Sequence, residues 1–431
     1  MKAAEFKWGP LSNRQKMLLS WWTDNSPYKD YEGIIADGAI RSGKTIAMGF
    51  SFVVWAMTRY NGEAFAICGK TIGTVRRNVV RKLKQQLRAR GYKVEDHRSD
   101  NVLEISKGTV SNLFYLFGGK DEASQDLVQG ITLAGCFLDE VALMPKSFID
   151  QVTGRCSVDG SKFWFNCNPA SPQHYFYVEW ICHCRQRRLV YLHFTMDDNL
   201  TLTERIKDRY KALYAGVFYQ RYILGLWVMA EGLIYDMFHR ENHVLQSDLL
   251  DYIGEQYVSC DFGIQNATVF LLWQKTLQGK WVCRREYYYS GRDNKIQKTV
   301  KELSEGMETI LPRDRDGLII KPKQIIVDPS ASALITELRN RGYHVLSAKN
   351  DVLDGISDVS TMLRQNGIGF DASCINTINE FGSYAWDAKA ANNGEDRPIK
   401  TNDHAMDAVR YFVVTMRLVN KNNKELKRQR G

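Results

Sequence analysis

Short apolar runs that end in small or polar residues recur through the first half of the chain. Gly33 to Ala36 has the pattern of a short apolar strand, and the apolar run from Ile46 to Met57 is long enough for a buried helix. Further apolar strands are predicted at 135–138 and 163–165, and polar side chains follow each of them. Strands of this kind around a buried helix predict an α/β unit.

Beyond about residue 230 the pattern changes. Runs at 257–263, 267–274 and 280–289 are rich in β-forming residues and are spaced for an antiparallel meander, and another strand is predicted at 324–327. A helix is predicted to open near residue 402, because apolar residues at 405, 408, 409, 412, 413 and 416 form one stripe. We therefore predict two domains, at 1–232 and 255–420, with a linker at 233–254 and a basic tail at 421–431; a chain of 431 residues also exceeds what one core usually holds.

The net charge of +9 is unevenly distributed. Ten basic residues lie between Lys70 and Arg98, against the two acids Glu95 and Asp96. Such a segment is either a surface that binds a polyanion or an ordinary solvated helix, and the segment alone leaves both readings open. The basic cluster at 185–188 and the basic tail favour a nucleic-acid partner.

Other classes of protein are disfavoured by composition. No run approaches the 18 or more apolar residues of a membrane helix, and the first sixteen residues lack the apolar core of a signal peptide. The nine cysteines are odd in number and lie mostly in apolar runs, which is typical of buried thiols in a reducing compartment. We expect a cytoplasmic protein that is neither secreted nor membrane-bound.

The sequence between the first strand and the first long helix matches G-x-x-x-x-G-K-[ST] at every fixed position, which are Gly38, Gly43, Lys44 and Thr45. Ser42, at the last variable position, would also lie in the nucleotide-binding loop. A loop of this kind between a strand and a helix turns backbone N–H groups toward phosphate oxygens, and the helix N-terminus adds partial positive charge. The lysine would reach the terminal phosphates and the threonine hydroxyl would bind Mg²⁺. The alternative is a glycine-rich turn with an incidental lysine.

An acidic partner for this loop follows on a later strand. The strand at 135–138 ends in Asp139 and Glu140, which resembles the Walker B element of the additional-strand, catalytic-glutamate class of ATPases. Asp139 would then hold Mg²⁺, and Glu140 would polarise the attacking water. An Asn at the tip of the next strand, before Pro169, could hydrogen-bond that water or the terminal phosphate, or could form only a turn. Gln15 could read the edge of adenine with its amide, although a surface glutamine is the simpler reading.

The second half carries acidic residues in an order that suits a two-metal nuclease. Asp261 and Asp328 each follow a predicted strand, and Asp403 and Asp407 share a face at the start of the last helix, next to His404. Two divalent ions need carboxylates that converge from separate elements, and oxygen ligands suit Mg²⁺ or Mn²⁺, with a histidine nitrogen favouring Mn²⁺. Individually, the acids could be turn residues or a helix cap.

The joint order of these motifs resembles the large terminase subunit of tailed bacteriophages, in particular the short forms from phages of Gram-positive bacteria. The motifs are the phosphate loop, LDE at 138–140, FNCNP at 165–169, CDFG at 260–263, VDPS at 327–330 and NDHAMDAVRY at 402–411. The resemblance covers nearly the whole chain. It implies a P-loop ATPase domain of the additional-strand, catalytic-glutamate type, followed by an RNase-H-like nuclease domain.

The resemblance also implies a function and partners. It implies a motor that uses ATP to move double-stranded DNA into a procapsid and a two-metal endonuclease that cuts the concatemer. Its partners would be the portal protein and the small terminase subunit. The chain would form a homo-oligomeric ring on the portal, and whether it is a monomer in solution is left open. It would act in the host cytoplasm.

Site residues follow from the same resemblance. Gln15 would contact adenine, Lys44 and Thr45 would bind phosphate and Mg²⁺, and Asn168 would belong to the coupling motif. Arg41 would stabilise charge in the transition state, as an arginine finger does. In the nuclease, Asp261, Asp328 and Asp407 align best as metal ligands, ahead of Asp403 and His404. Many relatives carry a different acidic pattern where this chain has Asp328-Pro329.

Two other functions remain open from the sequence. One is a helicase or remodelling ATPase whose RNase-H-like domain binds nucleic acid without cutting it. The other is a nucleotide-dependent DNA-binding scaffold, which Glu140 argues against because a scaffold has no need of a catalytic carboxylate.

Overall fold

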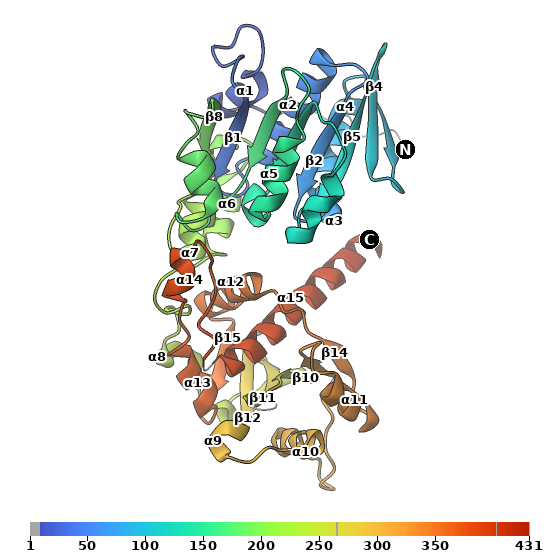
Figure 1. Ribbon diagram of the computed structural model, residues 1–431. Coiled ribbons are helices and arrows are strands. Elements are labelled where there is room, and N and C mark those ends of the chain that lie inside the picture. The colour runs from blue at the N-terminus through green and yellow to red at the C-terminus, as the bar shows by residue number, and fades with distance from the viewer. Residues whose placement is uncertain (1–8, 264–265, 402, 431) are drawn as a thin grey trace. The chain divides into compact units, whose positions relative to one another are not determined.

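The computed structural model describes residues 9–263, 266–401 and 403–430, apart from the side chains of residues 293 and 418–430 (Figure 1). The chain forms two compact units. The first holds the residues up to 211 together with 217–229 and 392–395, and the second holds 212–216, 230–391 and the residues from 396 onward.

An eight-stranded sheet forms the centre of the first unit, in the order β3-β4-β5-β2-β6-β7-β1-β8. The strands from β5 to β8 in this order are parallel, whereas β3, β4 and β5 pair in an antiparallel manner. The strands are β1 (Gly33–Gly38), β2 (Ala64–Gly69), β3 (Lys93–His97), β4 (Val102–Lys107), β5 (Val110–Gly118), β6 (Gly135–Asp139), β7 (Lys162–Asn166) and β8 (Leu189–Phe194). The helices are α1 (Asn13–Ser20), α2 (Lys44–Arg59), α3 (Ile72–Val75), α4 (Arg81–Arg88), α5 (Lys146–Gly154) and α6 (Glu204–Lys211), followed by the short α7 (Gly216–Phe218).

Both faces of this sheet are buried. Along β1, Ile34 packs into the core beneath α1, α2 and α4, whereas the next residue, Ile35, packs into the core beneath α5. Phe137 and Leu138 of β6 divide between the same two cores. A strand that is buried on both faces needs apolar residues at consecutive positions, which explains the unbroken apolar runs in the sequence.

The parallel arrangement places three strand ends together. β1, β7 and β6 are neighbours, and Asn166 at the end of β7 is paired in register with Asp139 at the end of β6. Loops at the carboxyl ends of parallel strands form the usual ligand-binding edge of an open α/β sheet.

The second unit contains a seven-stranded mixed sheet, in the order β14-β13-β10-β11-β12-β15-β9. β10, β11 and β12 form the predicted antiparallel meander, and the outer strands join it in parallel. The strands are β9 (Val244–Leu245), β10 (Tyr252–Asp261), β11 (Ala267–Thr276), β12 (Trp281–Ser290), β13 (Gln324–Val327), β14 (Val345–Ser347) and β15 (Ile368–Asp371). The helices are α8 (Arg240–His243), α9 (Gly291–Asn294), α10 (Val300–Ile310), α11 (Ser332–Asn340), α12 (Val352–Arg364), α13 (Ile375–Phe381), α14 (Ala388–Asn392) and α15 (His404–Arg430).

Helices cover both faces of the second sheet (Figure 1). α10 and α11 pack with β10 and β13 in one core. α15 packs on the opposite face, where the ring of Phe412 stacks on that of Trp273 with their centroids 4.2 Å apart. The apolar stripe predicted on this helix is buried.

The segment predicted as a linker is packed within the second unit. Tyr235 is buried against Phe381 and Tyr384, and the buried His243 lies 3.0 Å from the carbonyl oxygen of Leu363. β9, from the same segment, pairs with β15. These contacts join residues that are distant in the sequence, so the segment's own pattern does not indicate them.

None of the helices in the described parts of the chain combines the length and the apolar character needed to span a membrane.

Candidate active sites

The predicted phosphate loop joins β1 to α2. Gly38 and Gly43 have φ values of 116° and 89°, which favour glycine, and a Cβ at Gly38 would lie 2.0 Å from the carbonyl oxygen of Phe194. Between them, Arg41 also has a positive φ, of 61°. The loop therefore combines a required glycine conformation with the N-terminus of a long helix, an arrangement that binds phosphate.

Lys44 is buried at the centre of this loop. Its Nζ donates hydrogen bonds to the carbonyl oxygens of Gly38 (3.1 Å) and Ala39 (2.7 Å) and to Ser42 Oγ (3.2 Å). It also lies 3.3 Å from Asn168 Oδ1. Burial lowers the pKa of Lys44 to about 8, because the charged ammonium loses its hydration. The phosphate loop thus holds its cation among oxygen atoms.

Thr45, Asp139 and Asn166 form a compact polar group at the ends of β6 and β7. Thr45 Oγ1 donates to Asp139 Oδ1 (3.1 Å), and Asn166 Nδ2 donates to Thr45 Oγ1 (2.9 Å) and to Asp139 Oδ1. Burial, followed by the charge of Glu140, raises the pKa of Asp139 to about 7, although the hydrogen bonds from Asn166 and Thr45 oppose this rise. Among the described residues, Asn166 Oδ1 is buried without a hydrogen-bond partner. A hydroxyl, a carboxylate and an unpaired amide oxygen make a donor set that suits Mg²⁺.

Glu140 lies directly after β6 in a left-handed backbone conformation, with φ 60° and ψ 42°. Such a conformation is uncommon for a glutamate and is found most often at functional sites. Here it turns the chain immediately after Asp139, so that two consecutive carboxylates lie at the same edge of the sheet.

The other residues predicted for this site lie around the loop. Gln15 is buried, with Nε2 donating to the carbonyl oxygen of Ser42 (3.2 Å) and Oε1 accepting from Ser12 N (3.1 Å). The Arg41 guanidinium lies over the ring of Tyr210, 5.1 Å from its centroid. These contacts use one of the two N–H donors of the amide and one of the two acceptor sites of its oxygen, so one donor and one acceptor remain for an adenine edge.

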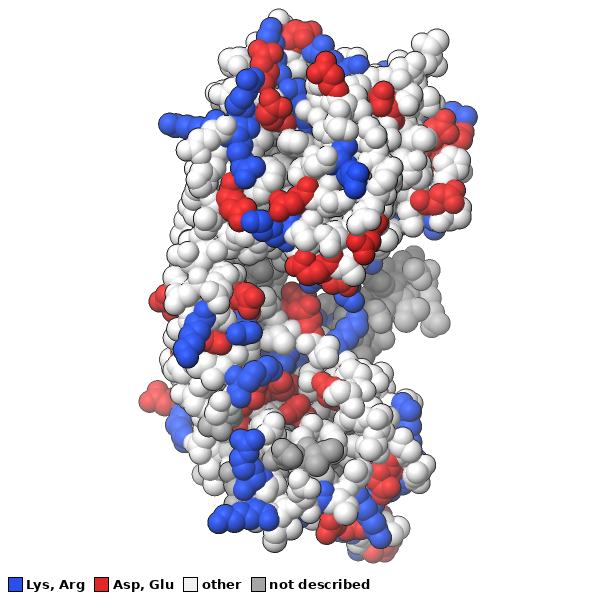
Figure 2. Space-filling model, in the orientation of Figure 1, with Lys and Arg blue, Asp and Glu red and all other residues white. Residues whose placement is uncertain are grey.

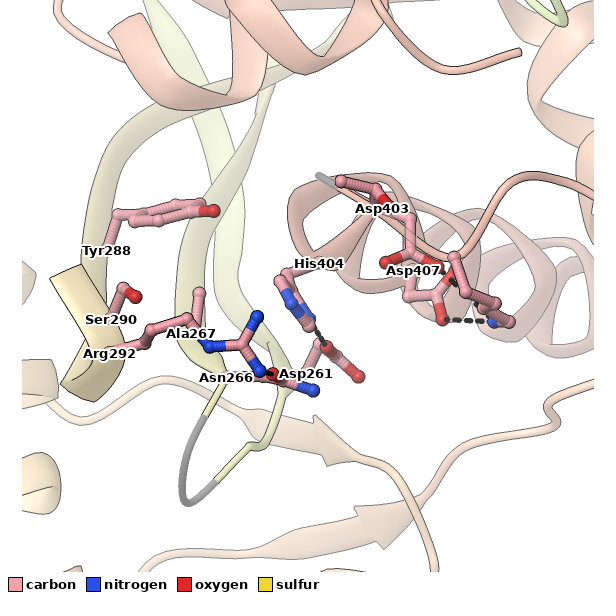
Figure 3. Close-up of a pocket in the computed structure, with 11 residues that line it drawn as sticks. Asp261, Asn266, Ala267, Tyr288, Ser290, Arg292, Asp403, His404 and Asp407 are labelled. Atoms are coloured by element: carbon pink, nitrogen blue, oxygen red, sulfur yellow. Dashed lines mark hydrogen bonds and ion pairs between the residues drawn. The ribbon is translucent and has the colours of Figure 1, made fainter. Parts of the chain in front are cut away.

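A second candidate site lies in the other unit, in an open pocket of about 330 Å³. Figure 3 shows that residues from the end of β10, from β12 and α9, and from the start of α15 face one another there. The lining residues are Asp261, Asn266, Ala267, Tyr288, Ser290, Arg292, Lys400, Thr401, Asp403, His404 and Asp407. Four of the five residues predicted to bind metal in the nuclease domain thus line a single pocket.

Hydrogen bonds and ion pairs orient these four side chains. His404 Nδ1 lies 2.9 Å from Asp261 Oδ2 (Figure 3), and this hydrogen bond raises the pKa of His404. Burial raises the pKa of Asp261. Asp407 Oδ1 accepts from the buried Arg410 (2.6 Å). Carboxylate oxygens with one imidazole nitrogen form a donor set that suits Mg²⁺ or Mn²⁺.

Lys400 adds a cation at the same pocket. Its Nζ lies 3.3 Å from Asp403 Oδ2 and 3.8 Å from Asp407 Oδ2, and its side chain is 65% exposed. An ammonium between two carboxylates indicates where positive charge is most favourable in this pocket.

Asp328, the fifth predicted ligand, is not among the residues that line the pocket. It follows β13, which is parallel to β10 with Cys260 paired to Val327, so Asp328 and Asp261 lie at the same end of neighbouring strands. Its Oδ2 accepts from Tyr411 (2.6 Å), and its Oδ1 accepts from Ser330 N (2.7 Å). Burial acts to raise the pKa of Asp328, but these hydrogen bonds outweigh it and the pKa is lowered.

A buried glutamate supports the pocket from α13. Glu380 Oε2 accepts from the backbone N–H groups of Ala405 (2.7 Å) and Met406 (3.3 Å) at the start of α15, and its Oε1 accepts from Tyr288 (2.9 Å). Burial raises the pKa of Glu380 to about 7. Unsatisfied N–H groups at a helix N-terminus favour such a carboxylate, which here links α15 to β12.

Sequence reasoning did not assign Asn166, Glu380, Arg292 or Lys400 to either site. Asn166 had a signal, because it is the first polar residue after the apolar run of β7. Lys400 also had one, because it lies three residues before Asp403. Glu380 and Arg292 had none, since their positions depend on contacts between segments that are distant in the sequence.

The basic segment at 70–98 uses part of its charge internally. Arg76 and Lys84 pair with Asp96 at 2.8 and 2.9 Å, whereas Arg77, Arg81 and Lys82 are exposed. Figure 2 shows Lys and Arg interspersed with Asp and Glu on the face in view. The exposed basic residues could contact a polyanion, whereas the paired ones belong to an ordinary solvated surface.

Comparison with known proteins places these sites in a family. Residues 35–241 match the N-terminal domain described as terminase large subunit, T4likevirus-type, and residues 261–414 match the terminase RNAseH like domain. The large terminase from a thermophilic bacteriophage is 54% identical, with a TM-score of 0.88 over 94% of this chain and 99% of that chain. The chain belongs to the large terminase family. The same thermophilic phage terminase in complex with ADP is 53% identical, with a TM-score of 0.85 over 94% of this chain and 98% of that chain.

A more distant relative is the large terminase subunit of Escherichia phage T5. It is 25% identical over 242 residues, which cover 53% of this chain and 52% of that protein. The chain thus spans about half the length of this curated relative.

Membership in the terminase family confirms the predicted fold class, an α/β ATPase domain followed by an RNase-H-like domain. The predicted function, DNA packaging by an ATPase joined to a nuclease, is that of the terminase family, and the helicase alternative is not favoured. Nucleotide and divalent metal are the cofactors that these two domains imply.

Proposed function

We propose that this chain hydrolyses ATP to move double-stranded DNA into a procapsid and cuts the DNA with a metal-dependent nuclease. The observation that carries the cutting activity is the convergence of Asp261, Asp403, His404 and Asp407 on one pocket from two separate elements. The buried Lys44 loop facing Asp139 carries the ATPase activity. The ADP complex of the thermophilic phage terminase supports nucleotide binding by this chain.

In the ATPase, each residue has a role that fits its position. Thr45 and Asp139 would hold Mg²⁺, oriented by Asn166, and the metal would neutralise charge on the phosphates. Lys44 would exchange its carbonyl partners for the terminal phosphate oxygens. Glu140 would accept the proton of the attacking water. Gln15, Arg41 and Asn168 are proposed contacts to adenine, to transition-state charge and to the terminal phosphate, respectively.

In the nuclease, the carboxylates would hold two divalent ions. Asp261 and Asp407 would be the central ligands, with Asp403, His404 and Asp328 completing the set. These ions would generate the nucleophile and stabilise the leaving oxygen. Arg410 would hold Asp407 in place, and Glu380 would fix the first turn of α15. The histidine nitrogen favours Mn²⁺ alongside Mg²⁺.

The partners follow from the packaging function. We propose docking on the portal protein of the procapsid as a ring of identical chains, recruitment by a small terminase subunit, and a location in the host cytoplasm. The resemblance between the motif order and that of large terminases supports these proposals.

Plasmid cutting by the purified full chain tests the function. We expect supercoiled DNA to be nicked and linearised with Mn²⁺, more slowly with Mg²⁺, and not at all with EDTA. Equal cutting in EDTA would contradict a metal-dependent nuclease, and no cutting by folded protein with either metal would favour an ATPase that lacks nuclease activity.

Asn166→Ala tests the polar group around Asp139. Loss of a side chain that orients proposed metal ligands is expected to weaken Mg²⁺-dependent binding of ATPγS by about 10-fold or more. Calorimetric titration with and without Mg²⁺ measures this effect. Binding without Mg²⁺ should remain close to that of the unmodified protein, and a variant that loses both equally would show that Asn166 only maintains the fold.

Lys400→Met tests whether a cation binds between Asp403 and Asp407. The Lys400 ammonium lies 3.3 and 3.8 Å from the two carboxylates that would hold the cation, so its removal would relieve like-charge repulsion. Two unit charges about 4 Å apart repel by about 1 kcal/mol in water and by more near a protein surface, so Mn²⁺ should bind about 10-fold more tightly. Electron paramagnetic resonance of free Mn²⁺ measures the affinity. Lys389→Met, at an exposed lysine on α14, removes the same charge elsewhere and should leave the affinity unchanged. Unchanged or weaker affinity in Lys400→Met would place the metal elsewhere.

A further inference from the structure

The nuclease pocket has two chemically different sides. Asp261, Asp403 and Asp407 form an acidic side, whereas Tyr288, Ser290 and Arg292 come from the end of β12 and from α9. A DNA phosphodiester carries negative charge, so the acidic side alone repels it. Metal ions offset part of this repulsion, and a fixed cation on the opposite side would further favour the approach of a phosphate.

The two cations that line the pocket differ in their partners. Lys400 is paired with two carboxylates of the acidic side. Within the described part of the chain, the Arg292 guanidinium pairs with no carboxylate and instead donates to the amide oxygen of Asn266 (3.3 Å). Figure 3 shows the Arg292 side chain extending into the pocket toward Asn266 and Asp261. Its donors are thus held by a weak neutral partner that an anion can replace.

The backbone that carries Arg292 is fixed relative to the acidic side. α9 begins directly after β12, where Ser290 is paired in register with Ala267 of β11. The carbonyl oxygen of Ser290 accepts from Asn294 Nδ2 (2.8 Å). Tyr288, two residues before Ser290, donates to Glu380, which also holds the start of α15. The pocket therefore holds the base of Arg292 at a defined distance from the metal-binding carboxylates.

We propose that Arg292 binds a backbone phosphate of the DNA strand that is cut. The guanidinium has a planar set of donors that can contact two phosphate oxygens at once, which a lysine cannot reproduce. A phosphate held by Arg292 would lie across the pocket from Asp261. This contact would orient the DNA strand over the metal-binding residues. The inference rests on the proposed nuclease function and assigns the residue that contacts the substrate.

DNA binding by the full chain tests this role without cutting. With Ca²⁺ replacing Mn²⁺, fluorescence anisotropy of a labelled short duplex gives the affinity at several salt concentrations. Arg292→Ala should weaken binding about 10-fold and reduce the slope of log K against log salt by about one. Arg292→Lys should keep the slope but recover only part of the affinity. Arg339→Ala, at an exposed arginine on α11, is the matched control and should behave like the unmodified protein.

Cutting rates at low DNA concentration provide the second readout, because other basic surfaces of the chain also bind DNA. Arg292→Ala should raise KM more than it lowers kcat. If Arg292→Ala has the same DNA affinity, salt slope and KM as Arg339→Ala, the proposed role of Arg292 is wrong. If the unmodified protein cuts DNA and Asp261→Ala does not, that result would leave the proposed nuclease intact. If the unmodified protein does not cut at all, the nuclease fails, and the salt slope still tests whether Arg292 binds phosphate.

Discussion

Asp261→Ala is expected to abolish Mn²⁺-dependent cutting of plasmid DNA, with a fall in rate of about 10³-fold or more, while Lys44→Ala cuts at the normal rate. Asp261 ends β10 at the floor of the pocket and bonds to His404, so its removal takes away one proposed ligand and releases another. A two-metal reaction depends on both ions, and losing about 4 kcal/mol of transition-state stabilisation corresponds to this fall. Agarose-gel analysis of plasmid forms over time measures it.

Asp316→Ala is the matched control for this experiment, because Asp316 is an exposed aspartate in the same unit. It should cut at the normal rate. Normal cutting by Asp261→Ala would contradict the nuclease assignment, and loss of cutting in Lys44→Ala would show that the nuclease depends on an intact phosphate loop.

Glu140→Gln is expected to reduce the ATP turnover rate by about 10²- to 10⁴-fold while leaving ATP binding nearly unchanged. Glutamine has the shape of glutamate but cannot accept the proton of the attacking water. The left-handed backbone at this position holds the side chain next to Asp139, and the substitution preserves that geometry. Phosphate release measures turnover, and calorimetry with ATPγS measures binding.

Glu63→Gln makes the same chemical change at a partly buried residue directly before β2 and should leave turnover unchanged. If Glu140→Gln hydrolyses ATP at the normal rate, another residue must activate the water. If it fails to bind nucleotide, Glu140 contributes to binding rather than to catalysis.

Elements with long or periodic apolar patterns were predictable from the sequence. α2, β6 and the buried stripe of α15 lie where the patterns place them, because each buries consecutive or helically spaced apolar residues. The segment 233–254 was predicted as a linker, and Tyr235 and His243 within it are buried in the second unit. Burial of single residues through distant contacts leaves no periodic signal in a sequence.

The sites divide in the same way. Thr45 and Asp139 could be paired because their motifs have fixed positions on a strand–loop–helix unit and on a strand end. The hydrogen bonds of Asn166 needed the register of β6 and β7, and the links from Glu380 to α15 and β12 needed the packing of α13. Supporting residues are therefore less predictable than the residues they support.

α15 carries His404 and Asp407 in its first turn, and its Phe412 lies in the core on Trp273. Because one helix serves both purposes, a cation bound at its first turn is thermodynamically linked to the folding of the whole unit. A ligand that binds only the folded state adds about 2.7 kcal/mol to the free energy of unfolding at 100 times its dissociation constant. The melting temperature of this unit should therefore rise as its metal sites are occupied, and it can be used to measure that occupancy.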